Sequence, residues 1–175
     1  MGLSEVGLET VQRAKAVASV CDVQIEYGLV SRGMEEKILP GLREMGVGVT
    51  AYGVLSRGLL SGSVLAKGDL RARLPRFTGE NLAKNQLLVA ALKKLADARR
   101  MTAVQMAIAW VLAKGEDIVP LIGSRKVAQV KEALGALEIN LSADEMKSLE
   151  IAVPADQIAG SRYDASQMAM LDSEK

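Results

Sequence analysis

The segment DVQIEYGLVSRGMEEKILPGLREMGVGVTA, from Asp22 to Ala51, decides the fold of this chain. Its first four residues, Asp22 to Ile25, predict a short strand, and its last five predict a second strand. Between them Met34, Ile38 and Leu42 recur every four residues among charged ones, which predicts an amphipathic helix. Two strands joined by a helix pair in parallel, because a parallel pair needs a long crossover connection.

The rest of the chain repeats this alternation. A third apolar run, at residues 118–122, predicts another parallel strand, so both edges of the expected sheet are open. Thr102 is the expected N-cap of one further helix, and Ser142 opens another with capping-box spacing to Glu145. Besides the helix from Met34 to Gly46, the pattern predicts helices over 11–20, 82–95, 102–113, 127–137 and 142–149, and a long connection over 53–79.

Composition narrows the possible functions. The 175 residues fit a single domain, and 22 Lys plus Arg against 21 Asp plus Glu provide no basic surface for nucleic acid or membrane. The chain contains no His, which excludes imidazole bases and Ser/His/Asp triads, and the lone Cys21 cannot build a metal site. The longest apolar stretch, Thr102 to Ala113, is too short to span a bilayer. No secretory signal is visible, so we expect a cytoplasmic protein.

Two motifs follow expected strands. Gly123-Ser124-Arg125-Lys126 joins a strand to a helix, where helix amides, a hydroxyl and a cation could hold a phosphate. An ordinary helix start with solvated cations is the alternative. Tyr52 directly follows another strand and could offer a flat face to a heteroaromatic ring, or it could be a core residue.

Five motifs follow one another along the chain. They are Gly2-Leu-Ser4, Gln24-Ile-Glu-Tyr27, Ala51-Tyr52 with Leu55-x-Arg57-Gly58, Ile122-Gly-Ser-Arg125 and Gly160-x-Arg-Tyr163. In this order and spacing they resemble the aldo-keto reductases. The resemblance extends along nearly the whole chain but covers only the C-terminal half of that family's (β/α)8 barrel, from the loop after the fifth strand onward. It therefore implies an α/β fold, half of a TIM barrel with parallel strands and outer helices.

The resemblance also implies an NADP(H) site. The family's site has groups for the nicotinamide, the pyrophosphate and the 2′-phosphate that distinguishes NADP from NAD. The implied residues are Ser4 and Gln24 at the carboxamide, Tyr52 at the ring, Gly53, Leu55 and Arg57 along the pyrophosphate, Gly123, Ser124 and Arg125 at the 2′-phosphate, and Gln129 and Glu132 beside the adenosine.

Three positions depart from the family's usual pattern. Glu5 stands where Asn is usual beside Ser4, Gly53-Val54 replaces Ser-Pro, and Ala133 replaces an Asn near the adenine. The first departure would put a carboxylate near the carboxamide, and each would weaken cofactor affinity.

The family's catalytic Tyr, Lys, Asp and His all come from the first half of the barrel. The chain has no His, and Tyr27, Tyr52 and Tyr163 match other positions. We therefore expect no catalytic residue and no carbonyl reduction by this chain alone, and a small carbonyl substrate only if the missing half is supplied. The alternative is a non-catalytic half-barrel with vestigial or regulatory nucleotide binding. In either case we expect a homo-oligomer or a complementary half-barrel to cover the open sheet.

Overall fold

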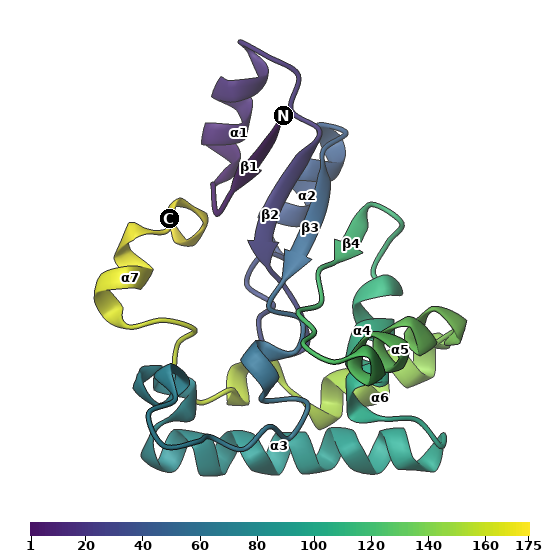
Figure 1. Ribbon diagram of the computed structural model, residues 1–175. Helices are drawn as coiled ribbons and strands as arrows, with labels where there is room; N and C mark the ends of the chain where they lie inside the picture. The colour runs from purple at the N-terminus through teal and green to yellow at the C-terminus, as the bar shows by residue number, and fades with distance from the viewer.

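The computed structural model describes residues 1–175 and contains one four-stranded parallel sheet in the order β1-β2-β3-β4 (Figure 1). The α/β half-barrel with outer helices is thus confirmed. The sheet has one strand more than the sequence pattern predicted, because three residues are too few to show a period. The strands are β1 (Gly2–Ser4), β2 (Asp22–Glu26), β3 (Gly48–Tyr52) and β4 (Ile118–Pro120).

Seven helices surround the sheet, and most lie where they were expected. The helix predicted from Met34 begins at Ile38, because Pro40 lacks an N–H and fits only within the first helical turn. The helix predicted over 11–20 begins and ends earlier, and the short last helix was not expected. The helices are α1 (Leu8–Lys15), α2 (Ile38–Glu44), α3 (Gly79–Ala98), α4 (Ala103–Leu112), α5 (Val127–Leu134), α6 (Ala143–Ala152) and α7 (Ala165–Met170).

The two faces of the sheet differ. Val23 and Val49 pair in register and are fully buried under the helices, as are their neighbours two positions along each strand. Gln24 and Thr50 point to the opposite face, where they are half-buried and polar. The hydrophobic core therefore forms between the sheet and the outer helices, and the face that a closed barrel would enclose remains open.

Helix α4 is the most buried helix. Thr102 is its N-cap, as predicted, and forms a full capping box that was not predicted. The Thr102 hydroxyl accepts from Gln105 N–H at 3.1 Å, and the Gln105 side chain accepts from Thr102 N–H at 3.1 Å. Trp110 on this helix is fully buried, with its ring centroid 5.5 Å from that of Tyr27. The capping box of α6, between Ser142 and Glu145, is formed as predicted.

The C-terminal segment, residues 160–175, returns to the start of the chain (yellow in Figure 1). Asp172 Oδ2 accepts hydrogen bonds from Gly7 N–H at 2.8 Å and from the Thr10 hydroxyl at 2.7 Å, and so caps α1. Ser173 N–H donates to the Glu5 carbonyl at 3.2 Å. The segment therefore lies against the carboxyl end of β1.

The cap of α4 gives a test of this fold. Thr102→Ala removes one side of the capping box, so we expect the free energy of unfolding to fall by about 1 kcal/mol in a urea titration. Thr78→Ala is the matched control, because Thr78 caps α3 without a side-chain hydrogen bond to that helix. An equal loss in both variants would contradict the assigned cap.

Candidate functional site

The carboxyl ends of the four strands carry the polar groups of the molecule's most elaborate site. Ligands of parallel α/β sheets bind at this edge because loops of variable sequence converge there. Glu5 follows β1, Glu26 and Tyr52 end β2 and β3, and Gly123 lies three residues beyond β4.

A pocket of about 460 Å³ lies between the loop after β3 and the start of α5. We call it the arginine pocket because Arg57, Arg71 and Arg125 all line it. It gathers seven of the residues that the resemblance implied for the pyrophosphate, the 2′-phosphate and the adenosine. These are Leu55, Arg57, Gly123, Ser124, Arg125, Gln129 and Glu132.

At the α5 end of the pocket, Ser124 and Arg125 are exposed and available. Arg125 forms no ion pair within the chain. The backbone N–H groups of Arg125 and Lys126 are not free, since both donate to Gln129 Oε1, at 2.9 and 3.1 Å. An anion would thus meet the Ser124 hydroxyl and the Arg125 guanidinium, and would reach the helix amides only if Gln129 turned away.

At the β3 end of the pocket, the two arginines, Arg57 and Arg71, form ion pairs within the chain. Arg57 adopts a left-handed conformation, with φ 53°, and its guanidinium lies 3.2 Å from Glu26 Oε2. Arg71 donates to the Arg57 carbonyl at 2.7 Å and forms hydrogen bonds to Asp69 through two of its nitrogens. These contacts were not predicted, and they hold the loop that borders the pocket in place.

Tyr52 presents its ring at the end of β3. Its hydroxyl donates to Glu5 Oε1 at 2.7 Å and lies 3.2 Å from the hydroxyl of Tyr163. Gly53 follows with φ +67°, and a Cβ on it would stand 2.8 Å from Cγ of Glu26. Glycine is therefore required where the family pattern has Ser, because the buried Glu26 side chain fills that space.

Ser4 and Gln24 do not reach the arginine pocket. They are directly paired between β1 and β2, on the open face of the sheet. The structure thus separates the implied residues into two groups, one at the arginine pocket and one near Tyr52.

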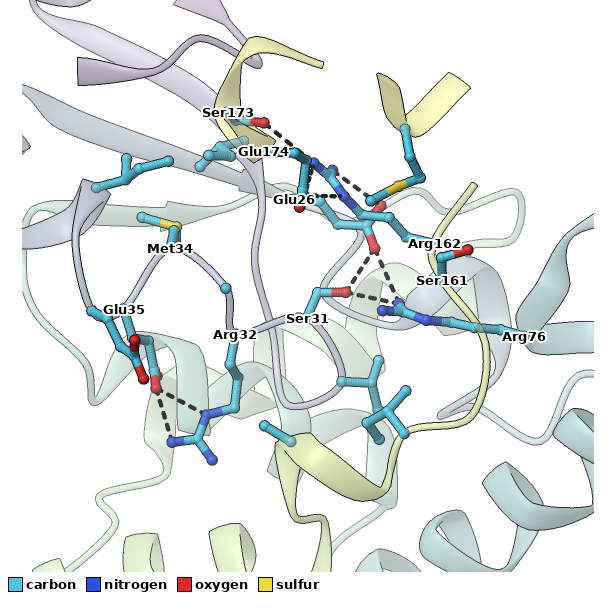
Figure 2. Close-up of a pocket in the computed structure, with 18 of the residues that line it drawn as sticks. Glu26, Ser31, Arg32, Met34, Glu35, Arg76, Ser161, Arg162, Ser173 and Glu174 are labelled. Carbon is cyan, nitrogen blue, oxygen red and sulfur yellow. Dashed lines mark hydrogen bonds and ion pairs between the residues drawn. The ribbon is translucent and has the colours of Figure 1, made fainter. Parts of the chain in front are cut away.

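Sequence reasoning missed a cluster of ion pairs at this edge, which we call the carboxyl-edge cluster. Glu26 is fully buried at its side chain and lies 3.2 Å from Arg57 and 3.3 Å from Arg76. Figure 2 shows Arg76 and Arg162 reaching Glu26 and its neighbours from opposite sides. Charged residues ending an apolar strand were the only signal in the sequence. The cluster consists of Glu5, Glu26 and Glu174 with Arg57, Arg76 and Arg162.

The cluster shifts the pKa of its members. Burial opposes ionisation of Glu5, but hydrogen bonds from Arg162, Ser173 and Tyr52 outweigh it and lower the pKa of Glu5 to about 2. Burial and hydrogen bonds to Tyr163 and Glu5 raise the pKa of Tyr52 well above its ordinary value. Tyr52 therefore stays protonated, and Glu5 is a carboxylate near neutral pH.

A second cavity, of about 560 Å³, lies under the C-terminal segment (Figure 2). Arginine and glutamate side chains line it together, and Arg32 is paired there with Glu35 at 2.8 Å. Apart from Glu36, the charged side chains that line the cavity are paired within the chain.

Two further features bear on the kinds of site available. None of the helices combines the length and apolarity that crossing a bilayer requires. No three Cys, Asp or Glu side chains lie close enough together to share a metal ion.

Comparison with known proteins places these features in a family. The sequence profile described as "Aldo/keto reductase family" matches residues 1–154. "Probable aldo-keto reductase 1" of Glycine max is 39% identical over 168 residues, which cover 93% of this chain and 48% of that protein. "Aldo-keto reductase yakc [NADP(+)]" of Schizosaccharomyces pombe is 36% identical over 171 residues, 93% of this chain and 50% of that protein.

Solved structures agree. A glycerol dehydrogenase from Gluconobacter oxydans matches with a TM-score of 0.81 at 30% identity, over 94% of this chain and 51% of that protein. An aldo/keto reductase from Klebsiella pneumoniae, solved in complex with NADP and acetate, matches with a TM-score of 0.66 at 25% identity, over 93% of this chain and 50% of that protein. The chain thus spans about half the length of the relatives that it matches.

The lowered pKa of Glu5 predicts a pH-dependent stability. A carboxyl group with a depressed pKa in the folded state stabilises the fold above its unfolded value and loses this effect as the pH falls through the folded value. We therefore expect wild type to be more stable than Glu5→Gln above about pH 5, and this advantage to vanish between pH 4.5 and about 2. Urea titrations of both proteins across this range measure the difference. A difference that does not change with pH would show that Glu5 is not held as a carboxylate.

Proposed function

Because the chain belongs to the aldo/keto reductase family, we propose that it is the NADP(H)-binding half of an oxidoreductase that acts on aldehydes or ketones. The observation that carries the proposal is the arginine pocket, in which Ser124 and Arg125 stand exposed and unpaired beside Gln129 and Glu132. A guanidinium and a hydroxyl side by side suit the 2′-phosphate of NADP(H).

The donor set fits the rest of the cofactor as well. Arg57 and the glycine-containing loop after β3 would follow the pyrophosphate, and Tyr52 would stack on the nicotinamide ring. Ser4 and Gln24 have side chains that can hydrogen-bond the carboxamide. When bound, the cofactor supplies or accepts a hydride. The S. pombe relative carries NADP(+) in its name and the K. pneumoniae relative was solved with NADP, which supports this choice of cofactor.

We propose that neither Tyr52 nor Tyr27 supplies the acid for the carbonyl oxygen at the ring. The Tyr52 hydroxyl donates to Glu5, and burial together with hydrogen bonds to Tyr163 and Glu5 raises its pKa. Tyr27 is fully buried in the core, where its hydroxyl donates to Glu35. We propose that the proton donor belongs to a complementary half-barrel, so that this chain alone does not reduce carbonyls.

A specific surface favours such association. Val127, Val130, Leu134 and Leu137 follow one another at helical spacing on α5 and the turn after it, and all four are exposed. Val119 on the edge strand β4 is exposed too, on the open face of the sheet, where it pairs with Thr50. We propose that a complementary half-barrel covers this surface, or that copies of the chain cover it for one another. In the latter arrangement nucleotide binding could be vestigial or regulatory.

Arg125 provides the direct test of the cofactor. Arg125→Met should weaken NADPH binding about ten- to a hundredfold, the worth of a charge-assisted contact with phosphate, and leave NADH binding nearly unchanged. Fluorescence titration with both nucleotides measures this. Lys126→Met is the matched control, because Lys126 does not line the arginine pocket. Wild type that fails to bind NADPH, or binds both nucleotides equally, would contradict the proposal.

The α5 surface predicts self-association in the absence of another partner. We expect a dimer or larger species in sedimentation at high protein concentration, and Leu134→Asp should shift it toward monomer by placing a charge in the apolar surface. Leu87→Asp on α3 is the control, since Leu87 is also exposed, at 72% against 56% for Leu134, but lies on another helix. Wild type that remains monomeric at high concentration would rule this association out.

A further inference from the structure

Arg162 is a buried cation beside Tyr52 that binding of the cofactor phosphates does not explain. Its guanidinium is 6% exposed and forms a two-pronged ion pair with Glu5, with both nitrogen–oxygen distances 2.7 Å. The two residues are separated by 157 positions in the sequence. The C-terminal segment thus returns to the sheet and brings a positive charge to the end of β1.

This ion pair directly adjoins the ring on which the nicotinamide would stack. The Tyr52 hydroxyl donates to Glu5 Oε1 at 2.7 Å, and Arg162 Nη1 lies 3.2 Å from the same hydroxyl oxygen. Glu5 is ionised, since its pKa is lowered to about 2. A negative and a positive charge therefore stand together beside Tyr52.

The other charges nearby are paired as well. Glu26 is shared between Arg57 and Arg76, and the Arg162 guanidinium also contacts Glu174 at 2.7 Å. The carboxyl-edge cluster contains three carboxylates and three guanidinium groups, so it carries no net charge. Removing any buried member would leave the cluster with a net charge, and its electric field would act on a ring that stacks on Tyr52.

The nicotinamide is sensitive to such a field because its charge changes with its redox state. The oxidised ring is a cation, whereas the reduced ring is neutral. A lone carboxylate beside Tyr52 would attract the oxidised ring and so favour NADP⁺ over NADPH, whereas a neutralised carboxylate gives little preference.

We infer that Arg162 is a specificity-determining residue that neutralises Glu5 and thereby lets the site bind reduced and oxidised cofactor with similar affinity. This rests on the proposed function, because it requires the nicotinamide to lie at Tyr52. It also gives Glu5, which replaces the family's usual Asn, a role that depends on the C-terminal segment.

The test compares three probes in the full-length chain by calorimetry at about pH 8, where glutamate is ionised. The probes are NADPH, NADP⁺ and 2′,5′-ADP, which lacks the nicotinamide. Arg162→Met should shift the ratio of the two dissociation constants about five- to tenfold toward NADP⁺, as expected for one unscreened charge at a partly buried site. Glu5→Gln should shift the ratio the opposite way, because it leaves Arg162 with only its partly exposed partner Glu174.

Three variants separate charge from structure. Glu5→Gln with Arg162→Met removes both charges and should return the ratio to within about twofold of wild type. Arg162→Lys keeps the cation and should retain the wild-type ratio. Glu174→Gln removes the other, 41% exposed partner of Arg162 and should leave the ratio unchanged, because solvent screens that charge. All variants should bind 2′,5′-ADP as wild type does.

The outcomes distinguish this inference from the proposal beneath it. If both single variants keep the wild-type ratio of the NADP⁺ and NADPH dissociation constants and still bind 2′,5′-ADP, the inferred role of Arg162 is overturned. The cofactor assignment would then stand. Failure of wild type to bind 2′,5′-ADP would overturn the cofactor assignment and the inference with it.

Discussion

The buried carboxylate of Glu26 is the constraint on which the carboxyl edge of this sheet depends. Its side chain has no exposed surface, and an isolated carboxylate in that position would be prohibitively unstable. Arg57 and Arg76 stabilise it from the loop between β3 and α3, at 3.2 and 3.3 Å, and the Ser31 hydroxyl donates to it at 2.7 Å. Because these partners come from separate segments, the long connection must fold over the end of β2 for the strand to be stable.

The same requirement explains how the two ends of the candidate site differ. Near Glu26 and Glu5 every arginine is paired, so these arginines fix the positions of Tyr52 and the loop after β3. At the start of α5, by contrast, Arg125 is exposed and unpaired. A free cation can bind a phosphate without first breaking an internal ion pair, whereas a paired one cannot. Under the proposed function, the 2′-phosphate would therefore bind at the α5 end, and ring stacking would occur at the Tyr52 end.

Local patterns in the sequence predicted the features that depend on neighbouring residues. The four-residue spacing before Gly46, the N-cap at Thr102 and the capping box at Ser142 all involve residues within a few positions of one another. Strand β1 was missed because three residues cannot establish a period. The pairing of Glu5 with Arg162 was missed for a different reason. It joins residues 157 positions apart, and no local pattern encodes which distant cation a carboxylate will meet.

The faces and edges of the open half-barrel differ in how much apolar surface they leave exposed to water. On the face that a closed barrel would enclose, polar side chains pair among themselves, as the Thr50 hydroxyl does by donating to Asp22 at 2.9 Å, so water can cover this face at little cost. At the β1 edge, the C-terminal segment already lies against the strand end and caps α1. The β4 and α5 side has no such cover, and it exposes the large aliphatic side chains of Val119, Leu121, Val127, Val130, Leu134 and Leu137. The free energy available from burying apolar surface is therefore concentrated at one end of the sheet. Any second half, whatever its origin, would gain most by docking first against α5, beside the arginine pocket, and only then enclosing the polar face.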